Sequence, residues 1–303
     1  MEKIKFLKMR YALAVLFSLL VFVLNAAADA SYWSDAQKVR DGVLYKVLDF
    51  TSPRLMKAWI MRVDLKTPGI SFVTNERDKR WGERMPDYTN GVDIICTKRI
   101  KTTDFMVRKR KEGYNMIVAV NTAPWQPWCK PWDHKWGNPA RWVVSHGKEI
   151  CAGSTPGEGE LFVIRKDGSA QITKRVPKSE WADVEHVHPG FEIIASNAVI
   201  NVSDKPYNKG LHPRTVFGLS SCGRYLYLLV VDGRQPNYSI GASLAEAAQM
   251  MIDAGAREVL NMDGGGSATL VIYDEENRKP RMLNHQRHGE RKVALSLGIA
   301  FKD

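Results

Sequence analysis

Short apolar segments of strand length recur along this 303-residue chain, separated by polar turns. Between residues 43 and 73 apolar and polar positions alternate, as in 59–65, and a Thr67-Pro68-Gly69 turn precedes 70–73. This pattern predicts a pair of strands that the turn joins in antiparallel orientation.

Continuous apolar runs predict buried strands further along the N-terminal half. Residues 114–120 form one such run, which ends at Asn121, and 161–164 form another. An Asp167-Gly168 turn joins the second run to 170–172, so we expect a hairpin there.

Two helices are expected from their start signals. Thr103 is the candidate N-cap of a short helix at 102–112. The segment Ser243-Leu244-Ala245-Glu246 has the spacing of a capping box, and it begins an amphipathic helix that reaches about Ala254.

The second of these helices lies between two apolar runs, at 225–231 and 258–262. Strand, helix and strand at this length form a βαβ unit, whose strands run parallel with a right-handed crossover. The residues after the strands, Asp232-Gly233-Arg234 and Asp263, are therefore expected to face one crevice at the same sheet edge. The predicted fold class is mixed α+β (α/β), a large mixed sheet with this C-terminal βαβ unit and flanking helices.

The first thirty residues have the pattern of a leader. Four basic residues precede an apolar run at 11–27, and Ala28-Asp29-Ala30 resembles a small-residue cleavage site. We expect a signal peptide at 1–30, a mature domain at 31–303 and a secreted or periplasmic protein without stable membrane insertion after cleavage. An uncleaved membrane anchor is the alternative.

The formal charge of +11 favours an anionic partner, such as a phosphorylated glycan. The sequence contains no stripe of basic residues at helical spacing, so nucleic acid is not an expected partner. The cysteines lack the CxxC spacing of zinc or redox sites, which leaves up to two disulfides or buried thiols as interpretations. They are Cys96, Cys129, Cys151 and Cys222.

The most unusual stretch follows the strand at 258–262, where Asp263 precedes Gly264-Gly265-Gly266 and Ser267. Glycines adopt positive φ and allow a ligand to approach backbone N–H groups, so this bend is a candidate anion-binding site. The alternative is a glycine-rich hairpin that the aspartate caps.

A proline-rich loop carries several tryptophans, which either stack on sugar rings or pack against one another. Further on, His186 and His188 point the same way on an expected strand, as metal ligands or as core histidines. The loop tryptophans are Trp125, Trp128, Trp132, Trp136 and Trp142.

From about residue 185 to the C-terminus, the order of motifs resembles the phosphodiester glycosidase family. Upstream, Asn121 also matches, whereas the tryptophan-proline loop departs from the family pattern and leaves the substrate open. The resemblance implies an exported glycosidase that hydrolyses a sugar-1-phosphodiester by C–O cleavage, without a cofactor or a metal. The matching motifs are Pro213-Arg214-Thr215, Asp232-Gly233-Arg234, Ser243-Leu244-Ala245-Glu246, Asn261-Met262-Asp263-Gly264-Gly265-Gly266-Ser267 and Glu290-Arg291-Lys292-Val293-Ala294.

A phosphate monoester leaves without prior protonation, so a cationic clamp can replace the general acid that an alcohol leaving group needs. We expect Asp263 to face the anomeric carbon or to activate water, with Arg214 and Arg234 on the phosphate. Asp232 is a second carboxylate, an orienting group for Arg234 or a turn residue. The expected catalytic residues are Asp263, Asp232 and Arg214; the expected substrate-binding residues are Asn121, which reaches a sugar hydroxyl, Arg234, Gly264, Gly265, Gly266 and Ser267; Glu192 and Glu290 are spare candidates.

Two functions from other classes remain open on the sequence. A non-catalytic glycan-binding protein would use the same crevice together with the tryptophan loop. A metal-dependent phosphodiesterase would use Asp232, Asp263 and His188 and would break a P–O bond.

Overall fold

The computed structural model describes residues 31–86, 94–127, 134–139 and 141–302. The expected leader and Cys129 lie outside the described residues. Cys96 and Cys151 are buried and Cys222 is exposed, and the structure places no disulfide among these three. None of the helices in the described ranges has the length and apolar character needed to cross a bilayer.

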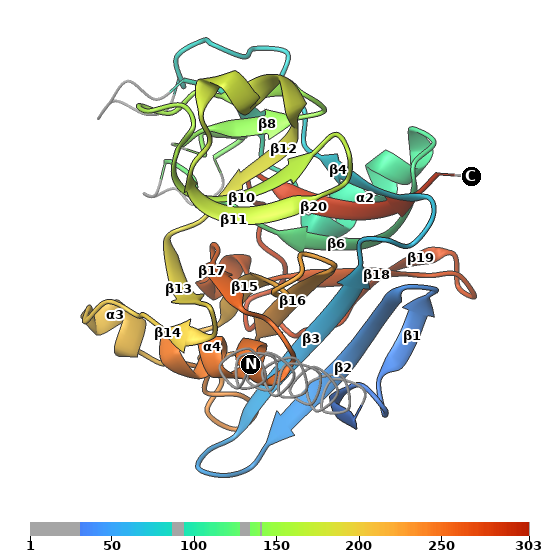
Figure 1. Cartoon of the computed structure of the whole chain (residues 1–303), viewed down its shortest axis with the longest axis vertical. Coiled ribbons are helices and arrows are strands. Elements are labelled where there is room, and N and C mark those ends of the chain that lie inside the picture. Colours follow the sequence, from blue (N-terminus) through green and yellow to red (C-terminus); the bar gives the residue numbers. More distant parts are fainter. Residues whose placement is uncertain (1–30, 87–93, 128–133, 140, 303) are drawn as a thin grey trace, which may run out of the picture.

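The largest unit is an eight-stranded sheet, which forms the lower half of the molecule in Figure 1. Every hydrogen-bonded strand pair described in it is antiparallel. In spatial order the strands are β1 (Gln37–Arg40), β2 (Val43–Phe50), β3 (Met56–Asp64), β16 (Tyr225–Val231), β15 (Arg214–Leu219), β17 (Glu258–Asn261), β13 (Glu192–Ser196) and β14 (Val199–Ile200).

Two five-stranded sheets and a short two-stranded one complete the architecture. One sheet has the order β11 (Ala170–Arg175), β10 (Glu158–Arg165), β12 (Val184–Pro189), β8 (Val143–Ser145) and β9 (Lys148–Cys151). The other has the order β19 (Lys279–Met282), β18 (Leu270–Asp274), β6 (Asn115–Asn121), β20 (Ser296–Phe301) and β4 (Ile70–Thr74); the short one pairs β5 (Thr97–Lys98) with β7 (Trp136–Gly137). The described helices are α2 (Thr102–Lys111), α3 (Pro206–Lys209), α4 (Leu244–Asp253) and the 3₁₀ turns η1 (Lys178–Asp183) and η2 (Gly265–Ser267).

The eight-stranded sheet is covered on both faces, which explains why β16 is apolar at nearly every position. On one face, Leu228 shares a hydrophobic core with Val118 and Ile299 of the β6–β20 sheet. On the other, Tyr227 packs in a second core with Met251 of α4. The main core therefore lies between two sheets, and the ends of β6 and β17 meet at their seam.

The mixed α+β class is confirmed, with a predominance of sheet. The expected unit of strand, α4 and strand is present, and β16 and β17 run in the same direction. They are not neighbours, because β15 lies between them and pairs antiparallel with both. Their C-terminal ends nevertheless lie at the same edge of the sheet, as the pattern predicts.

The expected pairing of 59–65 with 70–73 is wrong. β3 pairs with β2 on one side and with β16 on the other, so neither of its edges is open to β4. The turn at 67–69 instead carries the chain from one sheet to the next, where β4 pairs with β20.

The two expected helices differ in how well their starts were predicted. The capping box of α4 is confirmed, since the Ser243 hydroxyl accepts from the Glu246 N–H and the Glu246 carboxylate accepts from the Ser243 N–H. α2 begins after Lys101 rather than at Thr103, which lies in its first turn. A distant carboxylate, Glu290, caps this helix by accepting the Thr103 N–H (2.9 Å).

Candidate active site

Asn121, the last residue of β6, links the five-stranded sheet that contains β6 to the eight-stranded sheet. Its side-chain N–H donates to the carbonyl of Asp263 (2.6 Å), and its carbonyl accepts from the Thr215 hydroxyl (2.8 Å) and the Thr269 N–H (2.9 Å). Asn121 is fully buried and all of these contacts are internal. The side chain that we expected to bind a sugar hydroxyl instead holds Asp263 in place.

Asp263 follows β17 and is 7% exposed. Its N–H donates to the carbonyl of Thr122 (2.8 Å), so its backbone is fixed to the end of β6. Burial raises the pKa of its carboxyl to about 6, against the opposing effects of the Ser267 hydroxyl, the Arg291 charge and the Trp125 N–H. A carboxyl with this pKa changes protonation near neutral pH, as catalytic acids and bases do.

The glycine bend after Asp263 is determined by its backbone. Gly265 has a φ of 61°, and its N–H donates to the carbonyl of Pro213 (2.8 Å). A Cβ on Gly264 would lie 2.7 Å from that same carbonyl oxygen. The Gly264 N–H helps to lower the pKa of the Asp263 carboxyl, and the Gly265 N–H is occupied by the Pro213 carbonyl.

Two arginines lie directly against this bend. The guanidinium of Arg234 is 3.3 Å from the place that a Cβ on Gly265 would occupy, and a Cβ on Gly266 would overlap the guanidinium of Arg291. Arg234 itself has a positive φ of 61°, a conformation that non-glycine residues adopt mainly where surrounding structure imposes it. The glycines thus leave room for two planar cations side by side.

A cavity of about 520 Å³ opens in front of Asp263. Its lining includes Arg234 and Arg291 with the glycine bend, and also three aromatic side chains. These are Trp125, Phe191 and Tyr207.

A second cavity, of about 390 Å³, contains Asp232. It shares Arg234, Gly265, Gly266 and Arg291 with the first, so the two cavities adjoin at these residues. The structure therefore brings together Asp263, Arg234 and the glycines, and it places Asp232 in the adjoining cavity.

Asp232 directly follows β16 and organises the loop beyond it. Its carboxylate accepts from the Asn284 side chain (3.0 Å) and from the His285 N–H (2.8 Å). Burial raises its pKa to about 6, with the Asn284 and His285 hydrogen bonds opposing the shift. Asp232 is thus an anchor for the segment that carries Arg291, as well as a cavity residue.

Among the described residues, Arg214 is not one of those that line either cavity. Its fully buried guanidinium donates to the carbonyls of Ala242 (3.0 Å), Tyr207 (2.9 Å) and Gly210 (2.8 Å). Burial lowers its pKa. These contacts give Arg214 a structural position, and Arg291 occupies the place beside Arg234 that we expected Arg214 to fill.

The spare acidic candidates are also committed to the protein. Glu192 accepts from the Ser203 N–H (2.6 Å) and the Asn208 side chain (2.9 Å), which ties down the chain before α3. Glu290 caps α2 through Thr103. Ser267 is completely buried next to Asp263, and among the described residues it lines neither cavity.

His188 is enclosed between two hydroxyl groups. Its Nδ1 contacts the Thr122 hydroxyl and its Nε2 the Thr74 hydroxyl, both at 3.0 Å, and burial lowers its pKa to about 3. It is fully buried and, within the described part of the chain, lines neither cavity that holds Asp232 or Asp263. The arrangement does not support the ligand set of the metal-dependent phosphodiesterase.

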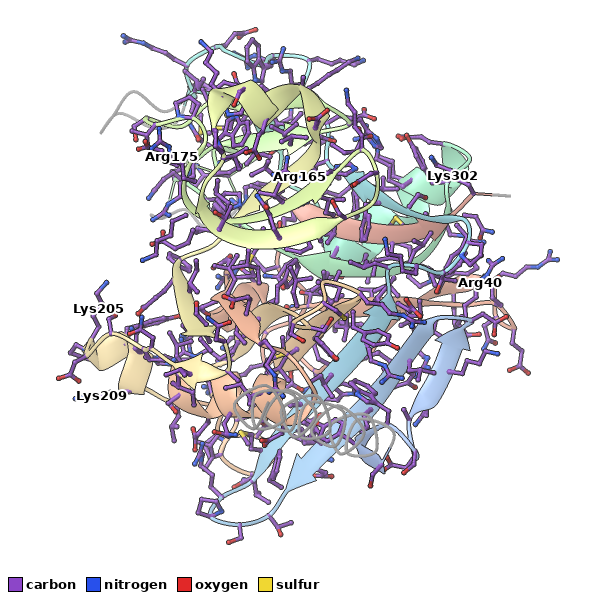
Figure 2. All side chains as sticks on the ribbon, viewed as in Figure 1. Arg40, Arg165, Arg175, Lys205, Lys209 and Lys302 are labelled. Carbon is purple, nitrogen blue, oxygen red and sulfur yellow. The ribbon has the colours of Figure 1, made fainter. Side chains whose placement is uncertain are left out.

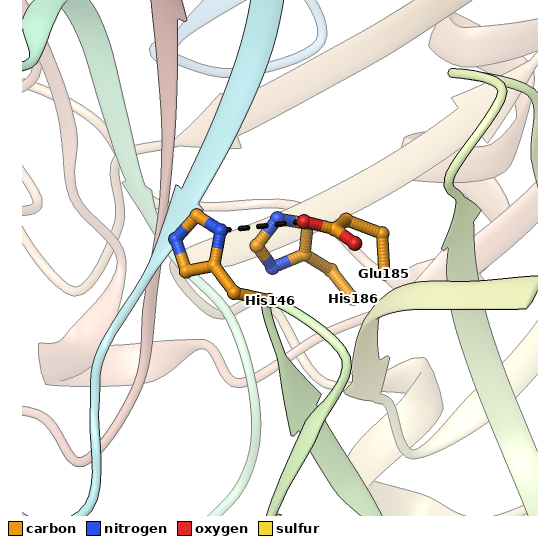
Figure 3. A group of neighbouring side chains, drawn as sticks. All are labelled: His146, Glu185 and His186. Atoms are coloured by element: carbon orange, nitrogen blue, oxygen red, sulfur yellow. Dashed lines mark ion pairs between the residues drawn. The ribbon is translucent and has the colours of Figure 1, made fainter. Parts of the chain in front are cut away.

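His186, two residues earlier on β12, belongs to a different group. Figure 3 shows it with His146 and Glu185, whose Nδ1 and carboxylate oxygen are 3.4 Å apart. The potential ligand atoms of the three residues lie within 4.8 Å of one another. His186 Nδ1 also contacts the Thr74 hydroxyl (3.0 Å), so both histidines of the motif share one threonine.

The described tryptophans of the loop have two kinds of surroundings. Trp142 stacks on Trp181 with ring centroids 4.9 Å apart, and Trp136 is buried in a small core, as in the self-packed interpretation. Trp125 lies instead on the cavity of Asp263, with the Arg99 guanidinium 4.0 Å from its ring centroid. Trp128 and Trp132 lie outside the described residues.

The cavity with Asp263 thus combines a buried carboxyl with two cations and aromatic rings. Residues 114–300, more than half of the chain, match the family model for phosphodiester glycosidases. The chain therefore belongs to the phosphodiester glycosidase family, and the protein is a hydrolase.

Solved structures give the particular relatives. The catalytic domain of zebrafish N-acetylglucosamine-1-phosphodiester alpha-N-acetylglucosaminidase, auto-inhibited by its pro-peptide, is 18% identical, with a TM-score of 0.58 over 86% of this chain and 83% of that one. A hypothetical protein from Synechocystis is 11% identical, with a TM-score of 0.55 over 88% and 63%. An exported-protein candidate from Burkholderia pseudomallei is 14% identical, with a TM-score of 0.53 over 81% and 74%. No curated protein sequence matches the chain.

Arg291 is the cavity residue that the sequence did not single out. Arg291 stands in a family motif, but nothing in its spacing separates it from the basic residues next to it. The available signal was the triple glycine, because glycines allow another group to approach the backbone closely.

Proposed function

We propose that the protein hydrolyses a sugar-1-phosphodiester by breaking the bond between C1 and the bridging oxygen. The observation that carries this proposal is the wall of the larger cavity, where Arg234 and Arg291 lie on the glycine bend next to Asp263. This places cations for a phosphate beside a carboxyl for the anomeric carbon.

The phosphate is the leaving group in this reaction. Two guanidinium groups meet its oxygens in a planar, bidentate manner and stabilise the charge that grows as the C1–O bond breaks. No acid has to protonate the bridging oxygen, since a phosphate monoester is a stable anion. This accounts for a clamp of Arg234 and Arg291 where other glycosidases have a second carboxylic acid.

The sugar occupies the larger cavity, whose volume of about 520 Å³ is in the usual range for ligand sites. The faces of Trp125 and Tyr207 suit the apolar C–H faces of a pyranose ring. Asp263, ionised above its pKa of about 6, then attacks C1 or removes a proton from the attacking water. In either route the oxygen of water ends on C1 and the bridging oxygen leaves with the phosphate.

We also propose that the protein acts after export, on a cell-wall, capsular or host glycan. The leader pattern at 1–30 and the charge of +11 support this location and an anionic substrate. The likeness to an exported-protein candidate supports it as well.

The decisive experiment is hydrolysis of a GlcNAc-1-phosphodiester in ¹⁸O-labelled water by the mature protein, with Asp263→Asn as control. Label in the sugar supports the proposal, and label in the phosphate overturns it in favour of P–O cleavage. Binding without turnover across a panel of sugar-1-phosphodiesters would instead indicate a glycan-binding protein.

A further inference from the structure

The two cavities that share the arginine wall differ in chemistry. The one with Asp263 contains the aromatic side chains, and the one with Asp232 contains a set of basic groups. The basic groups of the second cavity are Arg99, Arg234, Arg287, Arg291 and Lys292, together with His285 and His288.

The acids of the second cavity, Asp232 and Glu290, are fewer than its arginines and lysine. Asp232 is bound by Asn284 and His285, and Glu290 is bound by Thr103 at the start of α2. Burial raises the pKa of both carboxyls. The cavity therefore keeps an excess of positive charge.

Several of these cations already interact with other groups of the protein. Arg99 donates to the carbonyls of His134 (2.9 Å) and Lys292 (3.0 Å), and it lies over Trp125. Arg234 and Arg291 lie on the glycine bend and are taken up by the phosphate in the proposed reaction.

Arg287 and Lys292 are different, since both side chains are exposed at this cavity. Among the residues that the structure describes, neither forms an ion pair with an acidic side chain. Arg287 donates to the carbonyl of Arg234 (3.2 Å), which holds its guanidinium next to the wall. Arg287 and Lys292 are thus two cations without an acidic partner among the described residues. They line the same cavity as Arg234 and Arg291, which bind the phosphate in the proposed reaction.

We propose that the second cavity binds the alcohol part of the phosphodiester and selects an alcohol that carries its own anionic group. This deepens the proposed function and rests on it, because a sugar in the first cavity and a phosphate on the wall place the alcohol in the second. The anion is a phosphate monoester or a carboxylate, which Arg287 and Lys292 bind through charge-assisted hydrogen bonds. The substrate class is a sugar-1-phosphodiester of an acidic alcohol.

Basic residues are also spread over the rest of the surface, which supplies matched controls (Figure 2). Lys302 is exposed and directly follows β20. Among the described residues, it lines neither cavity of the site. Lys302→Ala therefore removes one positive charge without touching the proposed contacts.

The test compares two substrates with the same sugar-1-phosphate, one an ethyl ester and the other a 2-phosphoethyl ester. We expect the unmodified protein to prefer the 2-phosphoethyl ester by at least about tenfold in kcat/KM. Arg287→Ala and Lys292→Ala should each reduce this preference, and Arg287→Lys should restore part of it. Lys302→Ala should keep it unchanged.

The outcomes separate this inference from the function on which it depends. Hydrolysis of both esters at equal rates overturns the anionic alcohol and leaves the glycosidase intact. Hydrolysis of neither ester, on a protein that is folded by circular dichroism, overturns the proposed function. A preference that Lys302→Ala reduces as much as Arg287→Ala shows an effect of overall charge and also overturns the inference. A 2-carboxyethyl ester distinguishes a site for carboxylates from one for phosphate monoesters.

Discussion

Asp263 is buried, yet its carboxyl is held at the point where a cavity, two cations and an indole meet. We expect Asp263→Asn to lower kcat by about a hundredfold or more, because a loss of about 3 kcal/mol in transition-state stabilisation has this effect. The measurement is steady-state turnover of a sugar-1-phosphodiester. Near-normal turnover would remove Asp263 from the chemistry.

Arg214 is buried and Arg291 is half-buried, and the two arginines have different surroundings. Arg291→Lys should lower kcat/KM for phosphodiesters by about tenfold or more, with a much smaller effect on an uncharged aryl glycoside, because lysine cannot make the bidentate contact. Arg214→Lys should mainly lower the free energy of unfolding, by about 1–3 kcal/mol, since three backbone carbonyls lose their donor. Kinetics on both substrates and denaturant unfolding separate the two effects. A selective loss on phosphodiesters in Arg214→Lys would contradict this assignment.

At this scale the sequence located the site better than it assigned the roles within it. Asp263, Arg234 and the glycines come together because strand direction alone places them at one edge. Arg214 could not be separated from Arg291, since what distinguishes them is the carbonyls of Tyr207 and Gly210, which only the path of α3 brings to Arg214. Asn121 was located at its strand end, but its three internal partners come from distant segments.

Among the elements, local signals were accurate wherever the partner is also local. The capping box of α4 and the Asp167-Gly168 hairpin were both predicted, because their contacts span a few residues. The predicted antiparallel pairing of β3 with β4 is wrong, because β2 occupies one edge of β3 and the distant strand β16 occupies the other. Likewise, β15 enters between β16 and β17 from earlier in the sequence.

The start of α2 shows the same limit and leads to a prediction. Glu290 caps this helix from a distance of 187 residues in sequence, and it directly precedes Arg291. We expect Glu290→Ala to lower the free energy of unfolding by about 1–2 kcal/mol, through the lost cap and the lost charge at a helix N-terminus. It should also lower kcat/KM, because the segment with Arg291 loses its anchor.

Ser243→Ala is the control for this effect. It removes the cap of α4 at a similar cost of about 1 kcal/mol and leaves the Arg291 segment in place. Denaturant unfolding and turnover are measured for both variants. An equal fall in kcat/KM in Ser243→Ala would indicate that stability alone controls activity.

For the molecule as a whole, two buried carboxyls link stability to pH. The pKa of Asp232 and that of Asp263 are each raised from 3.8 to about 6 in the folded protein. Between these values the folded state binds more protons than the unfolded state, so their contribution to the free energy of unfolding falls as pH rises from about 4 to about 6. Each carboxyl contributes up to about 3 kcal/mol to this fall.

Asp263→Asn should remove one of these contributions. Relative to the unmodified protein, the variant should gain up to about 3 kcal/mol in free energy of unfolding between pH 4 and pH 7. Urea unfolding across this pH range measures the difference, and other titrating groups cancel in the comparison. A difference between the two proteins that does not change with pH would show that the carboxyl of Asp263 keeps its ordinary pKa.

The position of β20 in the five-stranded sheet governs when the molecule can be completed. It pairs with β6 on one side and with β4 on the other, although β4 was synthesised more than 200 residues earlier. During synthesis both neighbours wait with unpaired edges until residues 296–301 arrive, and the segment with Arg291 arrives just before them. The sheet is therefore completed only after residues 296–301 have been synthesised, and the cavity wall that Arg291 contributes forms at the same late stage.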